Sequence, residues 1–180
     1  HLAVRYVAAE SRTLGDMFRR RTRRSSARPA MYRKQRGHWT RLSWADFYDQ
    51  ARSVAAGLAS LGVTAGERVA ILGPTQVPWA VYDMGCQLLG AVSLGIYPKQ
   101  AVEQIRYILD HSDTRVVLVA DQAELDNVLA ACDGLDRVIA SKVIAIIPWQ
   151  EQLFVANESR DARMTSPGQL EGAPRSDDDI

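Results

Sequence analysis

Apolar residues gather in short runs between residues 67 and 120, and longer stretches of mixed polarity separate these runs. The run 68–73 is apolar at successive positions, which is typical of a strand that helices cover on both faces. The runs 91–97 and 116–120 predict two more strands. With one helix in each gap, the pattern predicts a β-α-β-α-β unit with a parallel, internal sheet.

The two helices of this unit differ in how far we expect them to be buried. Thr75 is predicted to cap the first helix with its hydroxyl, and Pro78 falls in the first turn, where its missing N–H costs nothing. Apolar residues lie on more than one face of this helix: Trp79, Val81, Tyr82, Met84, Cys86, Leu88 and Leu89. Pro98 ends the strand that follows. The second helix, 101–110, has one apolar stripe at helical spacing, formed by Val102, Ile105, Ile108 and Leu109.

Three elements are predicted before this unit. Thr13, with Asp16 three residues later, has the pattern of a helix cap, and Leu14, Met17 and Phe18 give this short helix a narrow apolar face. Residues 30–34 and 38–42 predict a hairpin around a turn that contains glycine. A second cap is predicted at Ser43 with Asp46. The amphipathic helix that follows has its apolar residues at Phe47, Ala51, Val54, Leu58 and Leu61, before Gly62 ends it.

After the unit, Asp121 is predicted to cap a further helix, with Glu124 in the reciprocal position of a capping box. Its buried stripe is expected to be Leu125, Val128, Leu129 and Cys132, and Gly134 is expected to end it. A short strand is predicted at 137–140. The apolar run 143–147 either continues that strand or forms an edge strand that Pro148 ends.

The predicted domain organisation is a partial N-terminal α/β subdomain at 1–156, followed by a linker. Within it, 1–42 holds the first helix and the hairpin, and 43–156 holds the α/β core. The predicted fold is thus α/β, a partial doubly wound parallel sheet with helices on both faces. From residue 157 to residue 180 the composition shifts to Ser, Gly, Pro, Arg and Asp, which predicts a weakly ordered linker.

Composition places the chain among ordinary globular proteins, with 47% apolar and 24% charged residues in 180 positions. No apolar run approaches the roughly 20 residues that a membrane helix needs, and the N-terminus lacks a signal pattern, so we expect a cytoplasmic protein. Cys86 and Cys132 fall in apolar helix stripes and form no C-x-x-C motif. They are therefore predicted to be buried free thiols, in keeping with a reducing compartment.

Positive charge is concentrated at the start of the chain, where residues 1–41 contain twelve Lys and Arg but two acidic residues. The densest segment is Arg19–Arg24, on or just after the first helix. Its arginines can complement the C-terminal dipole of that helix. Alternatively, they attract anionic lipid headgroups or a phosphate-rich ligand. Nucleic acid is less well supported, because only Tyr32 and Trp39 are near enough in sequence to stack on bases.

Motifs that carry chemistry are few. The three histidines have no spacing that suggests a metal site, and His111 fits a helix C-terminus better than a catalytic base. The sequence contains no nucleophile elbow, no G-x-G-x-x-G and no Walker loop. The turn 73–76 joins a strand to a helix N-terminus, where free amides can hold an anion, although most such turns bind nothing. The acidic cluster 177–179 is expected to be a solvated tail.

Several local sequences, taken in order, resemble the opening of the AMP-forming acyl-CoA synthetases, which belong to the adenylate-forming superfamily. The first of these are Leu42–Asp46, Ala55–Leu58 and Leu61–Leu72, followed by Trp79 and Gly90–Val92. Others look specifically like the long-chain fatty acid–CoA ligase branch: Gly95–Pro98, Glu103–Ser112 and Arg115–Val119. The resemblance covers residues 13 to 140 and is distributed along the chain.

This resemblance implies a two-step reaction in the whole enzyme. ATP and a fatty acid give an acyl adenylate with the help of Mg²⁺, and the thiol of coenzyme A then displaces AMP. The family's phosphate loop, which ends in Pro-Lys-Gly, does not occur in this sequence, and residues 176–180 resemble the acidic lead that precedes it. We therefore expect an N-terminal fragment that is inactive alone and contains no catalytic residue and no metal ligand.

The resemblance also implies one candidate binding segment, because the family's coenzyme A channel passes near Gly95, Ile96 and Tyr97. Gly95 would permit a close approach and Tyr97 could line the passage, whereas the simpler interpretation is that Tyr97 and Pro98 only terminate a strand. Further expectations are a peripheral membrane contact through Arg19–Arg24 and a homodimer that covers an exposed apolar face. The alternatives are an enzyme that activates aryl or amino acids, and a non-catalytic module that binds a nucleotide or an acyl carrier.

Overall fold

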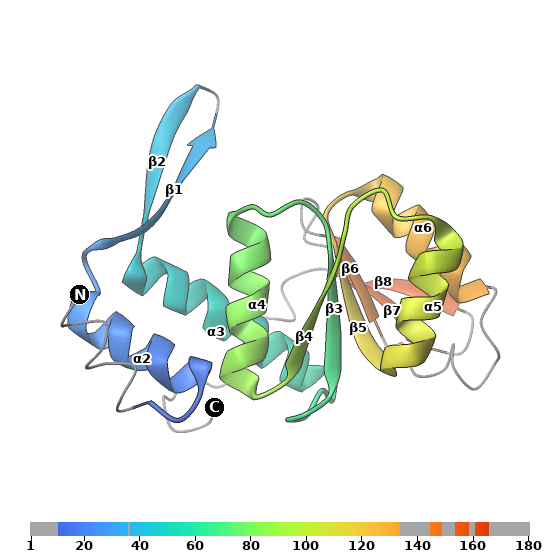
Figure 1. Ribbon diagram of the computed structural model, residues 1–180, viewed down its shortest axis with the longest axis horizontal. Helices are drawn as coiled ribbons and strands as arrows, with labels where there is room; N and C mark the ends of the chain where they lie inside the picture. Colours follow the sequence, from blue (N-terminus) through green and yellow to red (C-terminus); the bar gives the residue numbers. More distant parts are fainter. Residues whose placement is uncertain (1–10, 36, 134–144, 149–153, 159–160, 166–180) are drawn as a thin grey trace.

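Two layers of helices enclose a mainly parallel sheet in the computed structural model of the chain, which describes residues 11–35, 37–133, 145–148, 154–158 and 161–165 (Figure 1). The elements up to the third strand are α2 (Leu14–Ser25), β1 (Pro29–Gln35), β2 (His38–Ser43), α3 (Trp44–Ser60) and β3 (Arg68–Leu72). The central elements are α4 (Val77–Leu89), β4 (Val92–Ile96), α5 (Val102–Ser112), β5 (Thr114–Val119) and α6 (Gln122–Asp133). The last are β6 (Ala145–Pro148), β7 (Phe154–Glu158) and β8 (Asp161–Thr165).

The main sheet has the strand order β4-β3-β5-β6-β7-β8 in the described part of the chain. The first four strands are parallel, and β7 and β8 are antiparallel to their neighbours. β3 pairs with β4 on one side and with β5 on the other, so it is internal, as its apolar sequence predicts. The predicted fold class, a partial doubly wound parallel sheet with helices on both faces, is confirmed.

The two faces of the sheet carry separate apolar cores, because successive residues of a strand point to opposite faces. Val69 and Ile71 pack on the side of α3 and α4, whereas Ala70 and Leu72 pack on the side of α5 and α6. All four side chains are fully buried. The apolar stripe predicted for α5 lies in or against one of these cores, whereas the stripe of α3 is shared between the other core and a third one. In α6, Leu129 is 36% exposed, and Ala131 is buried instead.

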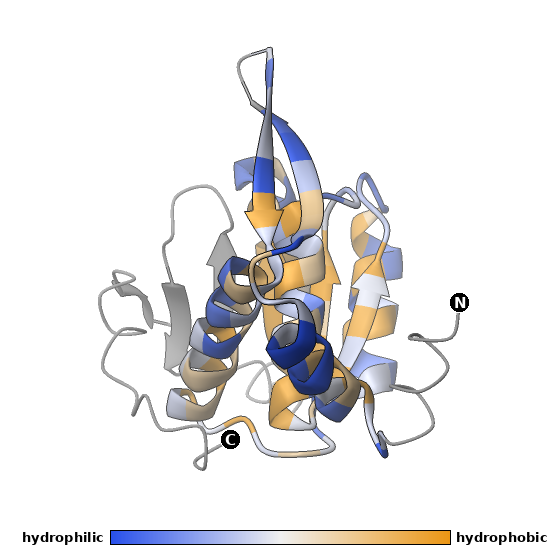
Figure 2. Cartoon of the chain, turned by 90° about the vertical axis from the view of Figure 1, so that its left-hand side faces the viewer, coloured by the Kyte–Doolittle hydropathy of each residue, from blue (hydrophilic) through white to orange (hydrophobic). Residues whose placement is uncertain are grey.

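A third apolar core joins α2 to α3 and α4. The ring of Phe18, on α2, lies 4.7 Å from the ring of Phe47, on α3, measured between centroids. A Cβ atom at Gly15 would lie 2.6 Å from the carbonyl oxygen of Gln87 in α4, so only glycine allows this approach. Leu14, which was expected in the apolar face of α2, is 52% exposed, because Gly15 and Phe18 are the residues of α2 that face α3 and α4. The outward surface of α2 is largely hydrophilic (Figure 2).

The β1–β2 hairpin stands away from the body of the molecule (Figure 1). It is antiparallel, with pairs from Gln35 and His38 near the turn to Pro29 and Ser43 at the base. Among the hairpin side chains whose burial the structure describes, most are exposed, and only Leu42 and Ser43 at the base are buried. The predicted hairpin is therefore confirmed, and α3 begins directly at its end.

Of the four predicted helix caps, those at Thr13, Ser43 and Asp121 are confirmed and the one at Thr75 is wrong. The Thr13 hydroxyl accepts a hydrogen bond from the Asp16 N–H, and Ser43 and Asp46 form a complete capping box. Thr75 does not cap α4, because the helix begins one residue later, with Gln76 as its N-cap and without a side-chain cap. Pro78 lies in the first turn as expected, where no backbone N–H is needed.

The C-terminal part of the sheet differs from the sequence prediction. β6 is not an edge strand, because it pairs with both β5 and β7. β7 and β8 occupy residues 154–158 and 161–165, part of which the composition assigned to a linker. Such an antiparallel pair is held by backbone hydrogen bonds, which polar sequences also make. The strand predicted at 137–140, the helix end at Gly134 and residues 166–180 lie outside the described residues.

Candidate functional site

The carboxyl ends of β3, β4 and β5 lie at the same edge of the sheet, since these strands are parallel. The chain leaves β3 toward α4 on one face, but it leaves β4 and β5 toward α5 and α6 on the other face (Figure 1). In open α/β sheets, ligands bind where neighbouring strands send their connections to opposite faces. The candidate site is therefore this edge, formed by the turns at 73–76, 97–101 and 120–121.

The fold separates the three residues that the resemblance placed near a coenzyme A channel. Ile96 is 3% exposed and belongs to the core beneath α5 and α6. Gly95 is exposed, and a Cβ atom there would lie 3.5 Å from Trp79 of α4, which is an ordinary contact. Tyr97 directly follows β4 and is 82% exposed. A ligand at this edge could thus touch Gly95 and Tyr97, but not Ile96.

A polar contact joins β4 to α4 on the face that carries Gly95. The hydroxyl of Ser93 donates a hydrogen bond to a carboxylate oxygen of Asp83, and the side-chain amide of Gln87 donates to the Ser93 oxygen at 3.3 Å. These bonds link the strand to α4 in addition to the apolar contacts around it. Gly95 therefore sits on a strand whose position relative to α4 is fixed.

The turn 73–76 brings the first backbone amides of α4 to the same edge. Because Gln76 makes no capping bond with its side chain, no side chain at that position satisfies these amides. Gly73 is buried, whereas the next three residues are exposed. Free amides at a helix start can hold an anion, but every uncapped helix offers them. The turn alone therefore does not identify an anion-binding site.

Glu124 is a residue of this edge that the sequence pattern placed wrongly. Asp121 does cap α6, since its Oδ1 accepts the backbone N–H of Glu124 at 3.0 Å. The reciprocal bond, however, is replaced by one across the site, because Oε1 of Glu124 accepts the backbone N–H of Lys99 at 2.8 Å. Glu124 is only 6% exposed. The capping-box pattern drew attention to Glu124, but no feature of the sequence indicated that its partner would be Lys99, 25 positions away.

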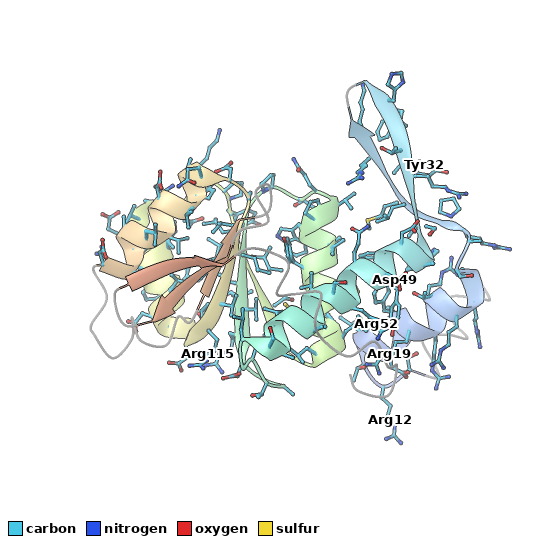
Figure 3. The ribbon with its side chains drawn as sticks, turned by 180° about the vertical axis from the view of Figure 1, so that it is seen from behind. Arg12, Arg19, Tyr32, Asp49, Arg52 and Arg115 are labelled. Atoms are coloured by element: carbon cyan, nitrogen blue, oxygen red, sulfur yellow. The ribbon has the colours of Figure 1, made fainter. Side chains whose placement is uncertain are left out.

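The basic segment Arg19–Arg24 forms most of the second half of α2 rather than a tail after it. Arg20 pairs with Asp16 at 3.3 Å, and the guanidinium of Arg21 lies 5.0 Å from the ring centre of Trp44. Arg19 lies where α2 packs against α3, near the labelled residues Asp49 and Arg52 (Figure 3). Several of these arginines therefore engage the protein itself. The last turn holds Arg23 and Arg24, where cations suit the helix dipole.

The titratable groups of the cores are held in their neutral forms. Burial raises the pKa of Tyr82 to about 12. Burial, with a smaller effect of Asp83, raises the pKa of Cys86 to about 12, and burial together with Asp133 raises that of Cys132 to about 11. Both cysteines are buried and free, as predicted, so neither is an activated nucleophile.

The remaining residues that could take part in catalysis or metal binding show no arrangement that favours such a role. His111 lies in the last turn of α5, as predicted, and its ring stacks on Tyr107 with centroids 5.5 Å apart. Within the described ranges, no group of three or more His, Cys, Asp or Glu residues could hold a metal ion. At the opposite edge of the sheet, Arg115 pairs with Glu67 at 3.2 Å (Figure 3). None of the helices that the structure describes is long and apolar enough to cross a bilayer.

Comparison with known families gives one match over most of the chain. The model of a family described as "AMP-binding enzyme" matches residues 18–180. The long-chain-fatty-acid–CoA ligase FadD15 of Mycobacterium bovis is 39% identical over 98 residues, which are 54% of this chain and 16% of that protein. The chain thus spans only a small part of this relative's length.

Solved structures share the fold. The N-terminal domain of FACL13 from Mycobacterium tuberculosis has a TM-score of 0.70 and 22% identity, and the match covers 94% of this chain and 38% of that one. A benzoate CoA ligase from Burkholderia xenovorans LB400 has a TM-score of 0.68 and 21% identity, over 89% of this chain and 28% of that one. At these identities the likeness concerns the fold alone.

Proposed function

Because the chain belongs to the family of AMP-binding enzymes, we propose that it is the N-terminal part of a ligase that joins a long-chain fatty acid to coenzyme A through an acyl adenylate. The observation that carries this proposal is the family match over residues 18–180, together with the similarity to a ligase of long-chain fatty acids. ATP, Mg²⁺ and coenzyme A are the reactants and cofactors that this activity requires.

The described residues do not fit an ATP or magnesium site. They contain no cluster of His, Cys, Asp or Glu for a metal, and the sequence has no phosphate loop ending in Pro-Lys-Gly. We therefore assign no step of the reaction to these residues. Their proposed contribution is the rigid sheet edge at which Gly95 and Tyr97 are accessible.

The full-length gene product tests the proposed activity. Pyrophosphate release and acyl-CoA formation are measured with saturated fatty acids of increasing length, with benzoate and with single amino acids. The proposal predicts turnover with the longer fatty acids, which depends on ATP and coenzyme A. Turnover with benzoate or an amino acid alone would instead establish an aryl-activating or amino-acid-activating enzyme, the first alternative from the sequence.

A non-catalytic binding module is the second alternative from the sequence. Calorimetry on the 180-residue chain with ATP and with coenzyme A separates it from the proposal. As part of a larger enzyme, the chain is expected to give no heat of binding with ATP. Tight binding of ATP to this chain would support the module and contradict the proposed role.

The proposed coenzyme A passage at Gly95 and Tyr97 has its own test in the full-length gene product. A Cβ atom at position 95 would meet Trp79 only at ordinary contact distance, so Gly95→Ala should fold, and Gly95→Val adds two methyl groups at the same position. We expect a higher KM for coenzyme A and an unchanged rate of ATP–pyrophosphate exchange. Val92→Ala, on the same strand but on its opposite face, is the matched control. An unchanged KM in Gly95→Val would remove Gly95 from the passage.

A peripheral membrane contact is proposed for the outer surface of α2, where Arg23 and Arg24 are exposed. Sedimentation with vesicles tests it: binding should increase with the fraction of anionic lipid and weaken with salt. Equal binding to neutral vesicles would contradict an electrostatic contact. The expected homodimer stays a prediction, to be examined by light scattering over a range of concentrations.

A further inference from the structure

The carboxylate of Glu124 is buried at the candidate site, between α6 and the turn that follows β4. Its Oε1 accepts the backbone N–H of Lys99 at 2.8 Å. Its Oε2 is also buried and has no hydrogen-bond partner in the part of the chain that the structure describes. The residue as a whole is 6% exposed. A buried carboxylate with one unsatisfied oxygen is costly, so its position calls for a physical reason.

Capping of α6 does not supply this reason. The backbone N–H of Glu124 already has a partner in Asp121 at 3.0 Å. A reciprocal capping bond would keep the Glu124 side chain at the helix start, close to water. The side chain instead turns into the protein and reaches a different connection of the sheet. Its hydrogen bond therefore acts on the turn after β4 rather than on its own helix.

That turn has an unfavourable backbone conformation at Lys99. Its φ angle is 62°, and among the described residues only Asp113 is another non-glycine residue with positive φ. The Cβ atom of a lysine is crowded in this left-handed region. A hydrogen bond to a charged acceptor is stronger than one between neutral groups, so the bond to Glu124 can offset the strain.

Tyr97, two residues before Lys99, depends on this turn for its position. It is 82% exposed, so packing of its side chain holds it only weakly. We propose that Glu124 is a positioning residue: its buried carboxylate fixes the left-handed turn at Lys99 and thereby sets where Tyr97 stands at the carboxyl edge of the sheet. The expected effect on coenzyme A binding rests on the function proposed above.

Amide hydrogen exchange in the 180-residue chain, followed residue by residue with NMR, tests this role. Glu124→Met removes both oxygens, one of them buried without a partner, but keeps a side chain of similar volume, so the global free energy of unfolding should not fall. The Lys99 amide should nevertheless exchange about tenfold faster or more, because it loses its charged acceptor. Glu124→Gln keeps an acceptor oxygen and should preserve most of the protection.

Gln122→Ala is the matched control, since it changes an exposed residue of the same helical turn, whose side-chain amide donates a hydrogen bond to Asp126 at 2.8 Å. It should leave the exchange of Lys99 unchanged. If Lys99 stays equally protected in Glu124→Met, the proposal is overturned. It is also overturned if amides of β3 and β5 lose protection to the same degree, because the effect is then global.

Kinetics of the full-length gene product separate this proposal from the proposed function. We expect Glu124→Met to raise the KM for coenzyme A several-fold, with ATP–pyrophosphate exchange unchanged and with recovery in Glu124→Gln. Faster exchange at Lys99 with an unchanged KM would uphold the positioning of the turn and refute the passage at Tyr97. Slow exchange at Lys99 would refute the positioning role whatever the KM.

Discussion

The β1–β2 hairpin and the β3–β5 pair are both made of neighbouring strands, but they differ in what covers them. Every residue from Val69 to Leu72 in β3 is fully buried, between α3 and α4 on one face and α5 and α6 on the other. In the hairpin, Tyr32 is 58% exposed and Trp39 is 68% exposed. An isolated two-stranded sheet is marginally stable at best. The stability of the hairpin therefore depends on its buried base, whereas the β3–β5 pair forms part of the core against which the helices pack.

The comparison teaches that apolar side chains in a strand do not by themselves indicate a core. Tyr32 and Trp39 carry large aromatic rings, yet none of the helices that the structure describes packs against the outer part of the hairpin (Figure 2). Their burial would need a covering element, and burial decides the free energy they contribute. Substitutions in the two regions should consequently differ by several kcal/mol.

The largest difference is expected for Ile71→Ala. Ile71 is fully buried in the core beneath α3 and α4, so the substitution should lower the free energy of unfolding by about 2–5 kcal/mol. Urea denaturation of the 180-residue chain measures it. A loss below about 1 kcal/mol would mean that this core is much looser than its burial indicates.

A smaller loss is expected where α3 and α4 touch. A Cβ atom at Gly85 would lie 2.5 Å from Cγ1 and 2.7 Å from Cβ of Val54, so Gly85→Ala should cost about 1–3 kcal/mol despite the better helix propensity of alanine. The pair Gly85→Ala with Val54→Ala should recover part of the loss in the same denaturation assay. No recovery would show that the two residues do not compete for this space.

The third prediction concerns the junction of the hairpin with the body, at the cap of α3. Ser43→Ala should cost about 1 kcal/mol at pH 7, because the cap of α3 loses its hydroxyl. The side-chain and backbone hydrogen bonds from Ser43 hold the pKa of Asp46 below its usual value of 3.8. The stabilisation from the ionised carboxylate is thus present above that value and lost as the pH falls below it.

The effect of Ser43→Ala should therefore shrink when urea denaturation is repeated near pH 3. Asp46→Asn is the control, since its amide oxygen still accepts the backbone bond but does not titrate. In that variant, the cost of removing the Ser43 hydroxyl should vary little with pH. An equal pH dependence in both backgrounds would assign the effect to other carboxylates.

The smallest effect is expected at the outer part of the hairpin. Trp39→Ala removes a large side chain that is 68% exposed, so the free energy of unfolding should change by less than about 0.5 kcal/mol. Urea denaturation beside Ile71→Ala gives the direct comparison. A loss comparable to that of Ile71→Ala would reveal that Trp39 is covered in solution.

Sequence patterns predicted the elements that local chemistry determines. The caps at Thr13 and Ser43, the pairing of the hairpin strands and the apolar stripes of α3 and α5 follow from residues a few positions apart, and the structure confirms them. The contact of Gly15 with Gln87 and the bond of Glu124 to Lys99 join distant segments, so no local pattern specifies them. The same limit applied to β7 and β8, whose pairing depends on the backbone rather than on composition.

The candidate site was predictable only in outline. The β-α-β-α-β pattern correctly placed Gly95 and Tyr97 at the carboxyl end of a strand. It could not show that Ile96, between them, faces the apolar core, because the residues on both sides of β4 look alike in the sequence. The assignment of coenzyme A to this edge came from the family resemblance and stays a prediction.

β3 precedes β4 and β5 in the chain but lies between them in the sheet. The three strands within residues 68–119 can therefore pair before any later strand has left the ribosome, and α6 then covers the face of the sheet on which α5 packs. β6 then adds to the free side of β5 as the next strand is synthesised. In this arrangement each later strand of the nascent polypeptide is added to strands that are already paired.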